Sequence, residues 1–379
     1  MYLTFRSRFP RCATWALVAL LAALVPALAQ PAAAKGFAQL NLLSDIPDFE
    51  ALRIDTNVVN SWGIAFGPTG ALWVADNGTG VATVYQPNGQ PTGLVVTIPP
   101  PEGEAGPATP TGIVFSPTSD FVVTKDDTSA PARFLFATED GTISGWNPQV
   151  DATNAILAVD RSATGAIYKG IAIATSEGGN FIYATNFHAG VVDVFESGFA
   201  YVTSFTDSAI PDGFAPFGIR NIGGRLVVTY AKQLLPDKAD DEAGPGNGFV
   251  VVFSPTGEVV KELISHGRLD SPWGVAIVPA GFGQIGGALL VGNFGDGHIN
   301  AYNPVTGAFI APVTDRTGRE IAIGGLWGLE AFNRKLPFPA GPGATGLPLL
   351  YFASGPNDEA DGLVGILRKA EARGRIGRF

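Results

Sequence analysis

Oxygen-bearing side chains recur in the Gly-rich turns of this 379-residue chain, where they could bind a metal ion. Carboxylate and amide oxygens are the ligands that Ca²⁺ takes in proteins. If the turns meet at one place, the candidate metal ligands are Asp76, Asn77, Asn186, Asn293, Asp296, Asn357 and Asp358. The alternative, which we favour, is that Asn, Asp and Gly are the residues that tight hairpins require, with no shared ligand.

A long polar segment, residues 231–248, provides a second group of candidates. It separates two apolar runs, and a loop of this size is a common place for recognition. The candidates for ligand binding in this segment are Lys232, Asp240, Asp241 and Asn247. The segment could equally be a solvated excursion without a partner.

Aromatic residues precede a Gly at Trp62, Phe217, Trp273 and Trp327. They could line a mouth on which a sugar or aromatic ligand stacks, or they could wedge between neighbouring sheets. We favour the second role because aromatic side chains dominate packing between sheets. Lys169 takes the equivalent position elsewhere in the chain, so it is a further binding candidate, unless it simply pairs with a neighbouring carboxylate.

Several kinds of chemistry are disfavoured by the residues present. The three histidines, His188, His266 and His298, do not have the spacing of a metal-binding helix. No G-x-S-x-G elbow, phosphate-binding loop or dinucleotide fingerprint occurs. Zinc, serine-hydrolase and nucleotide functions are therefore poor readings of this sequence.

The elements that must position these residues form a sixfold repeat. A residue followed by Gly and a short apolar run occurs with glycines at Gly63, Gly112, Gly170, Gly218, Gly274 and Gly328, separated by 49, 58, 48, 56 and 54 residues. Each interval can hold an inner strand, a second strand, a Gly-rich hairpin, a third strand and a variable fourth strand, which is the size of a propeller blade. The repeat predicts an all-β, six-bladed β-propeller with four-stranded blades.

The last repeat lacks an outer strand, whereas residues 38–43 form an apolar strand without a partner. We expect this N-terminal strand to join the last blade, which closes the ring and removes an exposed edge. In such a ring the loops that enter the inner strands and the hairpins after the second strands open on one face. We call this the hairpin face, and we expect it to carry the site.

Five segments carry a resemblance to a known family: residues 60–66, 73–80, 136–146, 183–187 and 290–297. They resemble a family of exported bacterial proteins that is conserved and has no assigned reaction, over about residues 38–368. More distantly, the units are similar to NHL-type repeats, a six-bladed group that includes lactonases, amidating lyases and cell-surface binding modules. The resemblance implies the propeller fold and brings no assigned reaction.

The ends of the chain carry different signals. Residues 1–29 have a basic start, an apolar run and Ala27-Leu28-Ala29 before Gln30, which is typical of a cleaved signal peptide. We therefore expect a secreted or periplasmic protein with one domain at residues 30–369 and no membrane span in the mature chain. The basic tail, 370–379, is expected to be disordered.

The net charge limits the partners. It is −10 for the whole chain, and removal of Arg6, Arg8 and Arg11 with the leader makes it −13. This charge argues against nucleic acid and leaves a small polar ligand, a carbohydrate or a protein, with a monomer expected. The sequence thus favours an exported binding or interaction module that uses the hairpin face. A calcium-assisted lactonase or lyase is the alternative, so Ca²⁺ is the one cofactor considered and enzymatic activity stays open.

Overall fold

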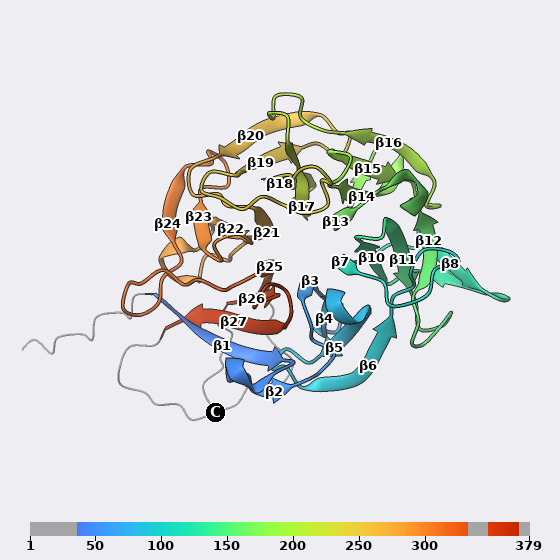
Figure 1. The fold of residues 1–379 in the computed structure, drawn as a ribbon, viewed down its shortest axis with the longest axis horizontal. Coiled ribbons are helices and arrows are strands. Elements are labelled where there is room, and N and C mark those ends of the chain that lie inside the picture. The colour runs from blue at the N-terminus through green and yellow to red at the C-terminus, as the bar shows by residue number, and fades with distance from the viewer. Residues whose placement is uncertain (1–35, 333–347, 371–379) are drawn as a thin grey trace, which may run out of the picture.

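The computed structural model describes residues 36–332 and 348–370. Six sheets surround a common axis and each contributes one four-stranded blade, which confirms the predicted six-bladed β-propeller (Figure 1). The predicted signal peptide and residues 371–379 of the predicted tail lie outside the described residues. No helix among the described residues is long and apolar enough to cross a membrane.

The first three blades follow one another along the chain. Blade 1 contains β3 (Ser61–Phe66), β4 (Leu72–Asp76), β5 (Val81–Tyr85) and β6 (Pro91–Thr97). Blade 2 contains β7 (Pro110–Phe115), β10 (Phe134–Thr138), β11 (Thr142–Trp146) and β12 (Ile156–Asp160). Blade 3 contains β13 (Tyr168–Ser176), β14 (Gly179–Asn186), β15 (Val191–Phe195) and β16 (Tyr201–Phe205). In each blade the first strand is the innermost.

The second half of the ring repeats this order. Blade 4 contains β17 (Phe214–Ile222), β18 (Arg225–Lys232), β19 (Gly248–Phe253) and β20 (Val259–Ser265). Blade 5 contains β21 (Pro272–Ile277), β22 (Leu289–Asn293), β23 (Ile299–Tyr302) and β24 (Phe309–Pro312). Blade 6 contains β25 (Leu326–Phe332), β26 (Leu349–Ser354), β27 (Leu363–Lys369) and β1 (Phe37–Ser44).

The outer strand of blade 6 comes from the start of the described chain. β1 runs antiparallel to β27, with Ala38 opposite Arg368 and Leu40 opposite Ile366. A two-residue strand, β2 (Arg53–Ile54), extends this sheet in parallel to β1. The two ends of the propeller therefore share one sheet, which leaves no unpaired edge between them.

One hairpin stands outside the blades. β8 (Val122–Lys125) and β9 (Thr128–Pro131) form a two-stranded sheet inserted between the first two strands of blade 2. Figure 1 shows it projecting beyond the rim of the ring. The other short elements are four 3-10 helices: η1 (Pro47–Phe49), η2 (Asn77–Thr79), η3 (Ser162–Thr164) and η4 (Gly283–Ile285).

The repeated glycines lie where neighbouring inner strands approach most closely. A methyl group on Gly218 would lie 2.2 Å from the carbonyl oxygen of Trp273 in the next blade. A methyl group on Gly328 would lie 2.5 Å from the carbonyl oxygen of Trp62, across the junction of blades 6 and 1. A side chain at these positions would push the inner strands apart, so glycine is required for the backbones to crowd around the axis.

We predict that Gly218→Ala strongly destabilises the protein, because its new methyl group meets backbone that has no room to move. Overpacking of this kind costs about 1–3 kcal/mol or more of the free energy of unfolding. Gly324→Ala is the matched control, since nothing lies within 4 Å of a methyl group there. Urea denaturation of both variants checks the prediction, and equal stabilities would contradict it.

Candidate functional site

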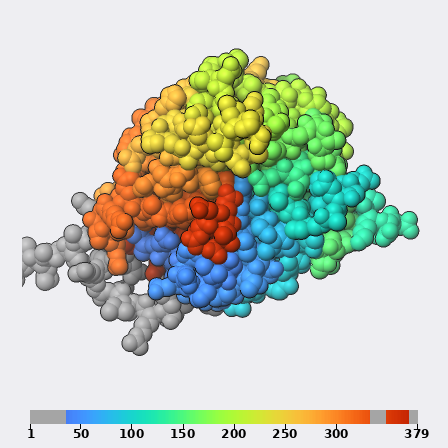
Figure 2. All heavy atoms as spheres, viewed as in Figure 1, coloured from blue at the N-terminus to red at the C-terminus, as the bar shows by residue number. Residues whose placement is uncertain are grey.

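Polar side chains from several blades converge at the hairpin end of the axis. They come from the β4–β5, β10–β11 and β26–β27 turns, from the β18–β19 loop at residues 233–247, and from the starts of the inner strands. In Figure 2 the red atoms of blade 6 lie between the orange atoms of blade 5 and the blue atoms of blade 1. The ring thus brings its last hairpin close to its first.

Lys169 is the centre of this group. Its side chain is only 2% exposed, and its ammonium forms an ion pair with Glu139 of the β10–β11 turn. Asp240, from the β18–β19 loop, places Oδ1 3.4 Å from the same ammonium. The ammonium also lies 5.2 Å from the centre of the Trp62 ring, which is within the range of a cation–π contact.

A chain of hydrogen bonds extends from Glu139 to blades 1 and 6. Asn77 donates to Glu139 Oε2 at 2.8 Å, and Asn60 donates to Asn77 Oδ1 at 3.3 Å. Asn60 also donates to Glu359 of the β26–β27 turn at 2.5 Å. In turn, the indole of Trp327 donates to Asn60 Oδ1 at 3.2 Å.

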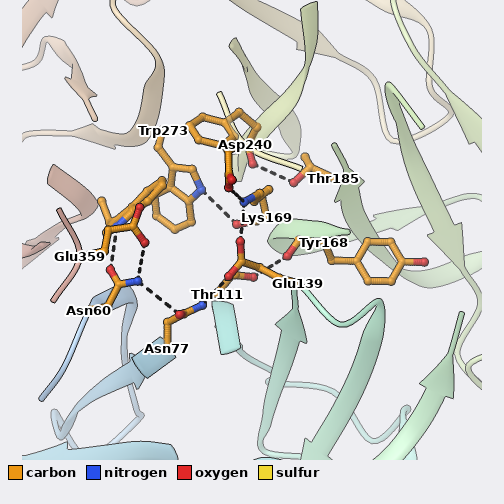
Figure 3. A network of polar contacts seen from close by, with 12 residues as sticks. Asn60, Asn77, Thr111, Glu139, Tyr168, Lys169, Thr185, Asp240, Trp273 and Glu359 are labelled. Atoms are coloured by element: carbon orange, nitrogen blue, oxygen red, sulfur yellow. Dashed lines mark hydrogen bonds and ion pairs between the residues drawn. The ribbon is translucent and has the colours of Figure 1, made fainter. Parts of the chain in front are cut away.

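One further bond brings blade 5 into the network. The indole of Trp273 donates to the carbonyl oxygen of Lys169 at 3.0 Å, as Figure 3 shows beside the Lys169 ammonium. Glu139 belongs to blade 2, Lys169 to blade 3 and Asp240 to blade 4. With blades 1 and 6 joined through Asn60, side chains of all six blades meet in one polar network.

Aromatic side chains pack beside this network, around the axis. Trp62 and Trp327 stack with ring centres 3.4 Å apart. Phe294 also stacks on Trp327, with ring centres 3.9 Å apart. Trp273 meets both indoles edge to face. Phe187 and Phe217 complete the buried group. The Lys169 ammonium therefore lies between carboxylates and aromatic rings.

The charges of the network shift each other's protonation. Burial disfavours the charged form of Lys169, but Glu139, Asp240 and Glu359 together outweigh this effect and leave its pKa above the ordinary value. Lys169 therefore stays an ammonium at neutral pH, as an ion-pair partner and not a nucleophile. Burial also raises the pKa of Glu359 to about 7, so this carboxyl could exchange a proton near neutral pH.

Several buried polar atoms near the network lack a hydrogen-bond partner, among them Trp62 Nε1, Asp241 Oδ2 and Ser271 Oγ. Oδ2 of Asp241 is covered and accepts no hydrogen bond, and burial raises the pKa of this carboxyl. The fully buried hydroxyl of Ser271 points toward Asp241 closely enough to counter that rise, yet it too makes no hydrogen bond. A buried polar atom without a partner is costly, so this spot can gain from a ligand atom or water.

Backbone strain accompanies the site in blade 6. Asn357, Asp358 and Glu359 all have left-handed φ angles, of 57°, 53° and 65°. Such angles cost about 1–3 kcal/mol each for residues other than glycine and tend to occur at functional sites. Here they turn the Glu359 carboxylate toward Asn60.

The structure divides the predicted charged and polar ligand-binding residues between two settings. Lys169, Asp240 and Asp241 come together at the network. Lys232 and Asn247 instead brace the β18–β19 loop, because Lys232 pairs with Glu242 at 2.7 Å and Asn247 donates to the carbonyl oxygen of Glu242.

The predicted tryptophans are near the network but mostly covered. Trp62 and Trp327 are each 1% exposed and stack on each other, so a ligand has no free face on which to stack. At Trp62 and Trp327 this burial favours the packing role over a stacking surface for a ligand. Only Trp273 is partly exposed.

The predicted metal ligands are used mainly inside their own blades. Asp76 is fully buried and accepts from Ser61 and Thr83, and burial raises its pKa well above the usual range. The amides of Asn186, Asn293 and Asn357 donate to Asp193, Asp296 and Asp361, in that order. Asp358 is exposed, and only Asn77 belongs to the network.

A general search for metal ligands gives a similar result. Among residues 36–332 and 348–370, no group of three or more His, Cys, Asp or Glu side chains is placed to hold a metal ion. Two carboxylates of the network, Glu139 and Asp240, instead pair with the Lys169 ammonium. The local hydrogen bonds of these turns agree with the other interpretation, in which Asn and Asp are present because tight hairpins require them.

The other end of the axis holds a cavity of about 260 Å³ lined by the inner strands. Arg220 crosses it, donating to the carbonyl oxygens of Val275 and Leu329 and pairing with Glu330. Sequence reasoning missed this pair, and it also left Glu359 and Asn60 out of the site. Glu359 directly follows the candidate Asp358, so that turn was the available signal.

Comparisons with known proteins identify relatives but no activity. No family model matches the chain. It is 31% identical over 340 residues to Uncharacterized protein R648 of Acanthamoeba polyphaga mimivirus, covering 87% of this chain and 80% of that protein. It is also 31% identical over 341 residues to Uncharacterized protein L690 of the same virus, covering 87% and 86%. These relatives are viral, so they do not support the bacterial, exported family that the sequence motifs predicted.

Solved structures that align with the chain at lower identity include a lyase and a WD40 β-propeller domain. Selenomethionine-substituted virginiamycin B lyase from Staphylococcus aureus aligns at 14% identity with a TM-score of 0.49, covering 88% of this chain and 98% of that chain. The WD40 β-propeller domain of Doa1 aligns at 10% identity with a TM-score of 0.45, covering 84% and 95%.

We predict that Glu359 makes stability fall as pH rises from about 4.5 to about 7. Over this range the unfolded carboxyl has lost its proton while the folded one keeps it, so the folded state binds more protons and loses stability with rising pH. Glu359→Gln should remove this part of the pH dependence. Relative to the wild type, the variant therefore gains stability up to pH 7 and then reaches a plateau.

Urea denaturation at pH 5, 6, 7 and 8 measures this difference. Glu258→Gln is the matched control, because Glu258 is exposed at the end of another hairpin. If Glu359→Gln and Glu258→Gln show the same pH dependence, Glu359 is not the titrating group.

Proposed function

Because this chain belongs to the family of the uncharacterized mimivirus proteins R648 and L690, whose names state no activity, we propose its function from the site alone. The protein is a propeller-based binding module that takes a small polar ligand at the hairpin end of its axis. The observation that carries this proposal is the polar network around Lys169, to which all six blades contribute.

The composition of the network supports binding over a purely structural role. A buried ammonium such as that of Lys169 costs free energy to remove from water, and apolar residues could hold the ring together at lower cost. Asp240 is 71% exposed and Glu139 is 25% exposed, so the network is open to solvent on one side. A ligand that arrives there meets charged groups held in place by neighbouring blades, with little ordering cost.

The calcium-assisted lactonase or lyase remains the second prediction from sequence. We give binding precedence because Glu139 and Asp240 are paired with the Lys169 ammonium, and no group of three or more His, Cys, Asp or Glu side chains among the described residues is placed to hold a metal ion. The raised pKa of Lys169 also disfavours an amine nucleophile at the site.

Export remains part of the proposal. The leader pattern of residues 1–29 supports a secreted or periplasmic protein. We predict that the protein recovered from cells begins at Gln30, which N-terminal sequencing or intact mass tests directly. Recovery of the chain with residues 1–29 attached, inside the cytoplasm, would contradict export.

Tryptophan emission provides the test of the binding function, because Trp62, Trp273 and Trp327 meet at the network. We expect at least one member of a panel of sugars, polyols, amino acids and small amines to change this emission saturably. Asp240→Asn should weaken that ligand's affinity about fivefold or more, and Trp273→Phe should reduce the signal.

Two variants serve as controls for this test. Asp127→Asn changes an exposed carboxylate in the turn of the β8–β9 hairpin and should leave affinity unchanged. Trp73→Phe changes an indole that packs against Phe134 between blades 1 and 2 and should leave the signal. If no compound changes the emission, or if Asp240→Asn binds like the wild type, the proposed site is wrong.

A further inference from the structure

Three carboxylates from alternate blades act on the charge of the Lys169 ammonium. Glu139 belongs to blade 2, Asp240 to the β18–β19 loop of blade 4, and Glu359 to the β26–β27 turn of blade 6. Glu139 and Asp240 form ion pairs with Lys169, and Glu359 acts on it electrostatically. When all three carboxyls are ionised, one positive charge faces three negative charges. The site therefore has an excess of two negative charges.

A buried acceptor adjoins this ring of carboxylates. Oδ2 of Asp241, next to Asp240 in the chain, is covered and has no hydrogen-bond donor. Burial raises the pKa of the Asp241 carboxyl, and the completely buried side chain of neighbouring Ser271 lowers it in part, although the two groups form no hydrogen bond. Burial of a carboxylate oxygen without a donor costs its desolvation free energy, and no hydrogen bond offsets this cost. A donor that reaches this oxygen would therefore form a strong, charge-assisted hydrogen bond.

The aromatic cluster favours the same kind of ligand. Rings attract cations through their electron-rich faces, and Lys169 demonstrates this at 5.2 Å from the Trp62 ring and 5.9 Å from the Phe187 ring. Trp273 is the partly exposed member of the cluster and bonds to the Lys169 carbonyl oxygen. Exposed Asp240 leaves a route from solvent to this charged surface.

We propose that the site binds a small organic molecule through a primary ammonium group, which docks among the carboxylates of Glu139, Asp240 and Glu359 and donates to Asp241. This inference rests on the proposed binding function and adds the chemical class of the ligand. A primary ammonium has three donors and one positive charge, which matches several acceptors and offsets the negative excess. The net charge of −10 on the whole chain attracts such a cation from solution.

A divalent metal fits the same place less well. Ca²⁺ takes six to eight oxygen ligands, whereas Glu139 and Asp240 are already paired with the Lys169 ammonium. No three metal-binding side chains of the described residues are arranged for an ion. An ammonium can instead bind beside Lys169 through directed hydrogen bonds to individual carboxylates.

Isothermal titration at pH 8 with propylammonium chloride tests the inference. The neutral molecule of similar shape, 1-propanol, and calcium chloride are titrated in parallel. We expect one propylammonium to bind per chain, and we expect no saturable heat from 1-propanol. Asp240→Asn and Asp241→Asn should each weaken propylammonium binding about fivefold or more, and Asp127→Asn should not change it.

Each outcome has a separate meaning. Equal binding of propylammonium and 1-propanol, or calcium binding that Asp240→Asn abolishes, overturns the ammonium inference. No heat from propylammonium, together with another compound that changes tryptophan emission, overturns the inference but leaves the binding function intact. If Asp241→Asn does not fold, Asp240→Asn decides alone, because Asp240 is mostly exposed.

Discussion

The close approach of six glycines around the axis is the constraint on which the structure depends. At Gly218 and Gly328 the backbone of the next inner strand lies where a side chain would begin. Because each blade must come this close to the next, the residues before these glycines are forced toward a common centre. Lys169 and three tryptophans occupy such positions, so the contact that builds the ring also builds the site.

This convergence explains why charge and aromatic rings occur together at one end of the axis. The Lys169 ammonium is kept from water by the cluster around Trp62 and Trp327, and it is compensated by carboxylates that hairpins of other blades supply. Removing one partner of a buried ion pair costs about 3–5 kcal/mol, since the other charge remains. Hydrogen bonds through Asn60 and Asn77 hold the carboxylates in place across blade boundaries. The blades are therefore coupled at the place where a ligand would bind.

The sequence predicted the six blades because their signal is local and repeated. Lys169 could be identified because it interrupts an aromatic position, and Asp240 because its loop is unusually long. The partners were harder to predict, since Asn60 and Glu359 lie 299 residues apart and Arg220 and Glu330 lie 110 apart. Turn residues such as Asn186 and Asn293 look the same in sequence whether they bind a ligand or only their own hairpin. Trp62 is buried by residues of other blades, such as Trp327, so the pattern of its own strand does not show this burial.

The central claim is that the hairpin end of the axis is the binding site. A crystal structure of the protein equilibrated with propylammonium tests this most directly. We expect electron density for the amine beside Lys169, within hydrogen-bond distance of the carboxylates of Asp240 and Asp241. Density in the cavity at the other end, against Arg220 and Glu330, with the hairpin end unchanged, would contradict it.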